Sequence, residues 1–223
     1  MKRLCVFGDS ITKGVILSDS GRYHILKENC VSLLCEGKGL DCDNYSKMGC
    51  TVEKGGEIFY RHEKEVERSQ AVLFEFGGND SDFNWKEISR SPEGSHTPNT
   101  ILSEYVWRYK ELIVSCIKKG TVPLVMNLPP VDAERYFDKI SKGLNKDNIL
   151  SWLGGSASFI YRWHEIYNQA LSSVCQDTGA KMVDIRSPFL SLRDYREYLC
   201  SDGIHPNEKG HLLIKETLDT QLS

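Results

Sequence analysis

The chain has 223 residues, of which 40% are hydrophobic and 26% are charged, and its formal net charge is −3. This length suits one α/β domain, and the composition excludes a disordered chain, a collagen and a coiled-coil rod. The slightly acidic balance argues against a nucleic-acid-binding protein, and no apolar run approaches the roughly 18 residues of a membrane-spanning helix.

Five short apolar runs predict the strands of a sheet. In chain order they cover residues 4–7, about 40–45, 71–76, 122–128 and 181–185. Gly, Asn, Asp or Pro bounds each run, which is typical of strands buried in a parallel sheet. The first run ends at Gly8. It is shorter than the apolar region of a secretion signal, which takes about 7–15 residues, so we expect a cytoplasmic protein.

Helical patterns lie between these runs. Apolar residues recur at helical spacing over 25–34 before Gly37, over 101–116 after the capping candidate Asn99, over 159–174 before Gly179, and over 212–218. This alternation predicts a parallel sheet with helices on both faces. We therefore expect an α/β fold with flavodoxin-like layering and a mostly parallel, five-stranded sheet.

Two segments do not follow the alternation. Residues 81–98 are polar and rich in turn formers, and residues 129–158 separate the fourth strand from the next obvious helix. Both follow the carboxyl ends of strands, where the active-site loops of open α/β sheets gather. We expect both to be loop insertions in a single domain that spans residues 1–223.

The eight cysteines predict free thiols. They contain no C-x-x-C pair, and this spacing argues against a zinc ribbon or a thioredoxin-like site. They are also too few for a disulfide scaffold. Unpaired thiols suit a reducing cytosol.

A serine and a histidine stand where acyl-transfer chemistry needs them. Ser10 follows the first strand in the turn Gly8-Asp9-Ser10, where it is a candidate nucleophile or, alternatively, the cap of a helix. His205 follows Asp202 at D-x-x-H spacing in one loop. This spacing can bring the carboxylate against the imidazole Nδ1–H, which leaves Nε2 free to face a serine.

Two turns offer donors for a developing oxyanion. Gly77-Gly78-Asn79-Asp80 follows the third strand, and Gly49 follows the second. The Asn79 side chain and the Gly49 backbone N–H can both donate at the sheet edge that carries Ser10. Each turn is a weak signal by itself, because Asn and Gly are common in turns.

Four separated blocks resemble the SGNH hydrolase superfamily, also called GDSL esterases and lipases. They are Gly8-Asp9-Ser10-Ile11, Gly49, Gly77-Gly78-Asn79-Asp80 and Asp202-Gly203-Ile204-His205-Pro206. The first block ends in Ile where the family motif has Leu, and the resemblance runs from about residue 4 to residue 211. It implies a three-layer α/β/α sandwich and ester hydrolysis. It also implies Ser10 as nucleophile, His205 as base, Asp202 as its orienting partner, and an oxyanion hole made by Ser10, Gly49 and Asn79.

We expect a serine esterase that works through an acyl-enzyme and needs no metal or organic cofactor. Its small-molecule ester substrates are expected to carry short acyl groups, such as acetyl on a carbohydrate. A lysophospholipid or a thioester is the alternative on the same site. No feature of the sequence indicates an oligomeric state.

Two hypotheses of other classes stay open. Asp9, Asp80, Asp202 and His205 all follow strand ends and can hold a divalent metal for phosphoester hydrolysis. The same fold can also serve as a non-catalytic module that binds a sugar or a lipid.

The two inserted segments carry large rings in polar surroundings, among them Trp85, Tyr136 and Trp152. Such rings suit the apolar face of a sugar or a short acyl chain. We predict that these three residues line the substrate site together with Asp9. The alternative is that the rings anchor their segments on the helices beneath.

Overall fold

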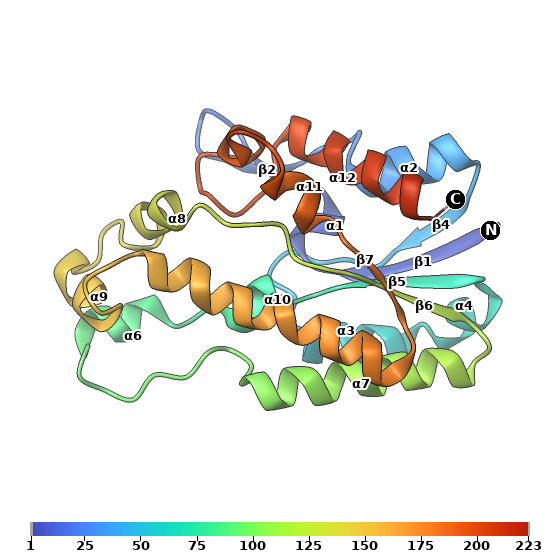
Figure 1. The fold of residues 1–223 in the computed structure, drawn as a ribbon, viewed down its shortest axis with the longest axis horizontal. Helices are drawn as coiled ribbons and strands as arrows, with labels where there is room; N and C mark the ends of the chain where they lie inside the picture. Colours follow the sequence, from blue (N-terminus) through green and yellow to red (C-terminus); the bar gives the residue numbers. More distant parts are fainter. Residues whose placement is uncertain (1, 223) are drawn as a thin grey trace.

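The structure, a computed structural model, describes residues 2–222. Five parallel strands form the central sheet in the order β4-β1-β5-β6-β7 (Figure 1). They are β1 Arg3–Gly8, β4 Asp41–Asn44, β5 Ala71–Glu75, β6 Val122–Met126 and β7 Lys181–Val183. Counted along the chain, this order is 2-1-3-4-5, which is flavodoxin-like. The predicted fold class is therefore confirmed.

The helices connect these strands and cover both faces of the sheet. Those below the sheet in Figure 1 are α3 (Val52–Arg61), α7 (Leu102–Lys118) and α10 (Ser158–Thr178), and those above it include α2 (Cys30–Lys38), α11 (Arg186–Leu190) and α12 (Glu208–Gln221). The shorter elements are α1 (Ser10–Lys13), α4 (Glu63–Arg68), α5 (Gly78–Ser81), α6 (Trp85–Arg90), α8 (Ala133–Ile140), α9 (Lys146–Trp152) and the 3₁₀ helix η1 (Tyr195–Tyr198).

Strand β1 explains why the predicted strands read as continuous apolar runs. Successive side chains of a strand point to opposite faces. Cys5 and Phe7 enter the core that α3, α7 and α10 close, whereas Leu4 and Val6 enter the core beneath α2 and α12. Because helices bury both faces, the strand needs no polar alternation.

The predicted helix over 25–34 is wrong in its first turn. Strands β2 (Val15–Leu17) and β3 (Tyr23–Ile25) form a separate antiparallel hairpin, which the sequence did not predict. Helix α2 begins only at Cys30, after Asn29 has capped it with its side-chain oxygen. Ile25 is 56% exposed, since the hairpin lies outside the main sheet.

The two inserted segments are more ordered than loops. They contain the short helices α6, α8 and α9, which pack with the start of α10 into a third apolar cluster. This cluster lies beyond the carboxyl ends of the strands, at the left of Figure 1.

Asn99 does not cap α7, which begins at Leu102 without a side-chain cap. Its side-chain amide instead donates to the Asn79 backbone oxygen at 2.9 Å.

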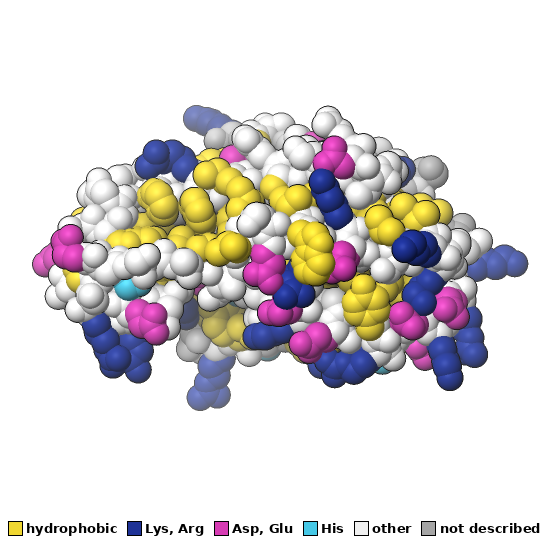
Figure 2. Space-filling view, turned by 90° about the horizontal axis from the view of Figure 1, so that it is seen from below, with side chains coloured by type: hydrophobic (Ala, Val, Ile, Leu, Met, Phe, Trp, Pro, Cys, Tyr) yellow, Lys and Arg dark blue, Asp and Glu magenta, His cyan; other side chains and the backbone are white. Residues whose placement is uncertain are grey.

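The surface is mixed in character. The face seen from below in Figure 2 carries hydrophobic side chains interleaved with Lys, Arg, Asp and Glu. On α7, Trp107, Val114 and Ile117 are 41% to 54% exposed, which single apolar residues on a solvated surface often are. Within residues 2–222, no helix combines the length and the apolar character needed to cross a bilayer.

Candidate active site

Ser10 lies at the carboxyl end of the central strand β1. Asp9 caps the short helix α1 by accepting the Ile11 N–H at 2.9 Å, so Ser10 is the first residue of that helix and not its cap. The side chain is 7% exposed, and its Oγ lies 3.0 Å from Nε2 of His205. Among the residues that the structure describes, none accepts a hydrogen bond from the Ser10 backbone N–H.

His205 and Asp202 lie in the loop before α12, and both are buried. Nδ1 of His205 is 2.7 Å from Oδ2 of Asp202, while Oδ1 accepts the backbone N–H groups of Ile204 and His205 at 3.2 and 3.1 Å. Burial raises the pKa of Asp202. The hydrogen bond and charge of His205, with the two backbone donors, outweigh burial and bring that pKa below its ordinary value. Asp202 is therefore an anion that holds the imidazole by one nitrogen.

Tyr23, on the hairpin strand β3, adds a fourth group to the hydrogen-bonded series Ser10, His205 and Asp202. Its hydroxyl donates to Oδ2 of Asp202 at 3.1 Å. Burial, and next the Asp202 charge, raise the pKa of Tyr23 above its ordinary value, which keeps the hydroxyl protonated. Oδ2 thus accepts from both Tyr23 and His205.

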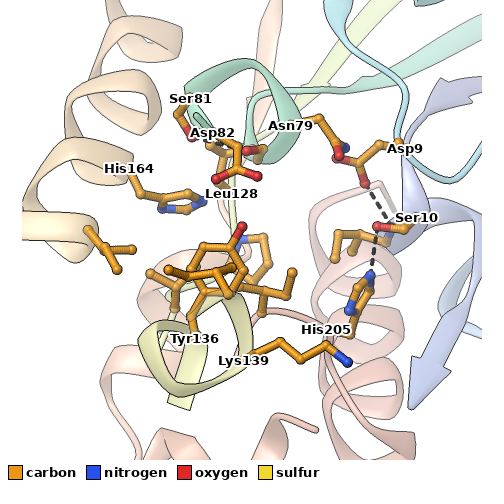
Figure 3. A pocket seen from close by; sticks show the side chains of 18 of the residues that line it. Asp9, Ser10, Asn79, Ser81, Asp82, Leu128, Tyr136, Lys139, His164 and His205 are labelled. Atoms are coloured by element: carbon orange, nitrogen blue, oxygen red, sulfur yellow. Dashed lines mark hydrogen bonds between the residues drawn. The ribbon is translucent and has the colours of Figure 1, made fainter. Parts of the chain in front are cut away.

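Gly49 and Asn79 present donors near Ser10. Gly49 is an exposed residue with a φ of +74°, a conformation that favours glycine, and within residues 2–222 its backbone N–H donates to no acceptor. The Asn79 side-chain amide donates to Oδ2 of Asp9 at 2.9 Å and to the Cys50 carbonyl at 3.3 Å. Figure 3 shows Asn79, Asp9, Ser10 and His205 at one side of the cavity.

Buried carboxyl groups support these residues. Burial raises the pKa of Asp80 to about 7, although both of its oxygens accept the Val52 N–H. Burial, and then the negative charge of Asp9, raise the pKa of Glu75 well above its ordinary value. Glu75 therefore holds its proton to a higher pH than an ordinary glutamate, and it lies under the turn that carries Ser10.

The carboxylates named in the metal hypothesis have separate partners. Asp9 accepts from Ile11 and Asn79, Asp80 from Val52, and Asp202 from His205. In the described part of the chain, no three His, Cys, Asp or Glu side chains gather in an arrangement that suits a metal ion. The donor geometry therefore does not favour the phosphoesterase hypothesis.

A cavity of about 340 Å³ opens beside Ser10. Asp9, Trp85 and Tyr136 are among its lining residues, together with Ser10, Gly49, Asn79 and His205. Trp152 is not among them, and its predicted contact with the substrate stays a prediction. Its ring packs edge-on against Phe83 and Phe159 in the third apolar cluster, where it anchors α9.

Four polar residues of this region were missed by the sequence analysis, namely Tyr23, Glu75, Asp82 and His164. Tyr23 lies on the unpredicted hairpin, and His164 lies within the apolar stripe of α10, where its pattern is that of a packing residue. Glu75 was the one detectable signal, because a carboxylate inside the apolar run 71–76 needs a special environment.

The sequence profile of the GDSL-like Lipase/Acylhydrolase family matches residues 6–213. The chain belongs to this family. The resemblance of the four sequence blocks to SGNH, or GDSL, hydrolases is thereby confirmed, and the family match covers both inserted segments.

Two curated plant relatives match part of the chain. GDSL esterase/lipase CPRD49 of Arabidopsis thaliana is 26% identical over 148 residues, which are 64% of this chain and 50% of the relative. GDSL esterase/lipase WDL1 of Oryza sativa subsp. japonica is 24% identical over 152 residues, or 66% of this chain and 51% of the relative. The chain thus spans about half the length of these curated relatives.

Solved structures share the fold over the whole chain. A lipase/acylhydrolase from Enterococcus faecalis has a TM-score of 0.67 at 17% identity, with 100% of this chain and 95% of the other covered. A mutant of Axe2, an acetyl-xylooligosaccharide esterase from Geobacillus Stearmophilus, has a TM-score of 0.65 at 18% identity, with 100% and 94% covered. At these low sequence identities, the structural similarity shows that the chain shares the fold of these proteins and no more.

Proposed function

We propose that the protein is a serine esterase in which Ser10 is the nucleophile, His205 the base and Asp202 its orienting partner. One observation carries the proposal. A continuous hydrogen-bonded chain runs from Asp202 through His205 to Ser10 and ends at the mouth of a cavity. Nucleophile, base and orienting group are the three parts that acyl transfer to serine requires.

The reaction follows from this geometry. Nε2 of His205 removes the Ser10 proton as Oγ forms a bond to the ester carbonyl carbon. The imidazolium is stabilised by the Asp202 anion, whose second donor, Tyr23, fixes the carboxylate. His205 then protonates the leaving alcohol, and water enters by the same steps to release the acid.

Three donors receive the negative charge that develops on the carbonyl oxygen. They are the Ser10 and Gly49 backbone N–H groups, which are without acceptors in the described chain, and the Asn79 amide. The 2.9 Å hydrogen bond to Asp9 keeps the Asn79 amide in place. When the oxyanion forms, the amide gives up its longer hydrogen bond to the Cys50 carbonyl and donates to the oxyanion instead. Asp9 is thus a positioning residue for Asn79.

For the substrate, we propose small esters with a short acyl group, such as an acetylated carbohydrate. Trp85 and Tyr136 in the cavity wall support this choice, because aromatic rings suit the apolar faces of a sugar. The cavity also favours a second candidate, a longer acyl chain as in a lysophospholipid or a thioester. Val131, Phe159 and Ile160 make much of its wall apolar.

A panel of p-nitrophenyl esters of rising chain length, run beside acetylated sugars with acetate release measured, tests the proposal. We expect hydrolysis by the wild type and a loss on the order of 10⁴–10⁶ in kcat for Ser10→Ala. The matched control is Ser20→Ala, which changes an exposed serine of the β2–β3 connection. Turnover by Ser10→Ala above a tenth of the wild-type rate contradicts the nucleophile assignment.

A further inference from the structure

The far end of the cavity holds polar groups that the proposed mechanism does not use. Asp82 follows α5, Tyr136 lies on α8 and His164 lies on α10, and all three line the cavity. In Figure 3 they lie across the cavity from Ser10 and His205, with their polar atoms directed into it. We call these three residues the far polar site.

Asp82 keeps free acceptor capacity in this place. Its Oδ1 accepts the Trp85 indole N–H at 2.8 Å. Burial raises the pKa of Asp82, while hydrogen bonds from Tyr136 and Trp85 oppose the rise. The Phe83 backbone N–H is a third donor to this group. A carboxylate offers about four lone-pair positions, so these three donors leave room for one from a ligand.

His164, which lines the same cavity as Asp82, has a ring nitrogen without a hydrogen-bond partner in the described chain. The residue is 7% exposed, and no residue of the described chain partners its Nδ1. Burial, and next the positive charge of Arg186, lower the pKa of His164 to about 3. The ring is therefore neutral and offers one donor and one acceptor. Buried polar atoms are almost always satisfied in proteins, and a cavity wall is where a ligand can satisfy one.

The charges around the far polar site select the chemistry of that ligand. The Asp82 carboxylate disfavours an anion. The positive charge of the Arg186 guanidinium lowers the pKa of His164, and for the same reason it disfavours a cation. This guanidinium is held in place by an ion pair with Glu165 at 2.7 Å and by hydrogen bonds that it donates to the Leu128 and Pro129 carbonyls. A neutral hydroxyl meets both demands, since it can donate to a carboxylate and accept from an imidazole.

We propose that Asp82, Tyr136 and His164 form a recognition site for a hydroxyl group on the substrate, separate from the scissile ester. The inference rests on the proposed esterase function and deepens it. It names the substrate class as esters with a hydroxylated acyl group or esters of a polyhydric alcohol. The apolar wall of the cavity would contact the carbon skeleton between the ester and this hydroxyl.

Two matched ester pairs test the proposal and separate the two sources of the hydroxyl. One pair is p-nitrophenyl hexanoate and p-nitrophenyl 6-hydroxyhexanoate, and the other is hexyl acetate and 6-hydroxyhexyl acetate. We expect the wild type to prefer the hydroxylated member of one pair by about tenfold in kcat/KM, as a hydrogen bond to a charged group predicts. Tyr136→Phe and His164→Phe each lower this preference to about threefold or less.

Tyr60→Phe is the matched control. It removes the same hydroxyl from a tyrosine on α3 that is 47% exposed and does not line the cavity. It should keep the wild-type preference. Melting temperatures identify a variant that fails to fold. If Tyr136→Phe or His164→Phe fails in this way, the other variant is used for the test.

Calorimetric binding of both pairs to Ser10→Ala makes the test independent of turnover. Tighter binding of a hydroxylated ester, lost in the Ser10→Ala, Tyr136→Phe double variant, supports the far polar site even when the wild type proves inactive. Equal rates and equal binding within both pairs overturn the far polar site and leave the esterase proposal standing. Absence of hydrolysis with selective binding overturns the esterase proposal alone.

Discussion

His211 is a buried histidine that ties the stability of the fold to pH. It lies on α12 with no exposed surface, and its Nδ1 accepts the Cys30 N–H at 3.4 Å. Burial, and next the charge of His205, lower its pKa from 6.5 to about 4. Between these two values only the unfolded chain takes up a proton at this position. The stabilising contribution is therefore present above pH 6.5 and is lost as the pH falls toward 4.

The size of this effect follows from the two pKa values. At pH 5.0 the ring is almost fully protonated in the unfolded chain but only about one-tenth protonated in the folded chain. Lowering the pH from 7.5 to 5.0 thus removes about 2 kcal/mol of unfolding free energy through His211. His211→Asn removes the titrating group and keeps an oxygen that can accept the Cys30 N–H.

Urea unfolding at pH 7.5 and 5.0 measures this difference. We expect the wild type to lose about 2 kcal/mol more than His211→Asn over this range. His24→Asn is the control, because this side chain on β3 is exposed, and it should follow the wild type. Equal losses in the wild type and His211→Asn would refute the assignment of the titrating group.

Three further changes test the site. Asn79→Ala should lower kcat by roughly 10²–10³ and leave KM nearly unchanged, because its amide acts on the transition state; a rise in KM alone makes it a substrate-binding residue. Asp202→Asn should still fold but lower kcat by about 10⁴, since an amide no longer orients the imidazole; full activity points to another orienting group. Glu75→Gln concerns stability. Because the pKa of Glu75 is raised, its stabilising contribution is present below pH 4.5 and is lost as the pH rises. The variant should therefore lose less unfolding free energy than the wild type as the pH rises from 5 to 8, and equal losses contradict a raised pKa of Glu75.

The central sheet was predictable because its residues obey one simple rule. Leu4–Phe7 and Ala71–Phe76 are buried on both faces, so apart from Glu75 they are apolar and stand out in the sequence. The β2–β3 hairpin has no such signature. Its two strands of three residues pair only with each other, and exposed positions such as Ile25 follow no alternation. The short helices α6, α8 and α9 were hidden because they pack on one another through a few large rings.

The candidate site divides in the same way. One part was predictable, because its residues follow strand ends or a local turn, and the topology of a parallel sheet brings such positions to one edge. These residues are Ser10, Gly49, Asn79, Asp202 and His205. The other residues reach the site only through tertiary packing, so the sequence did not indicate them. Tyr23 reaches Asp202 from the hairpin, across 179 positions of sequence. His164 and Asp82 meet the cavity only because α10 and the turn after α5 pack side by side there.

Labelling with a fluorophosphonate tests the central claim most directly, because the probe reacts with a serine only when a base activates it. Peptide mass spectrometry should find one adduct on the wild-type protein, at Ser10. The adduct should be absent from Ser10→Ala and His205→Ala and present on Ser20→Ala. A wild-type protein that stays unlabelled, or one that is labelled at another serine with Ser10 unmodified, would contradict the esterase proposal and favour a non-catalytic binding module.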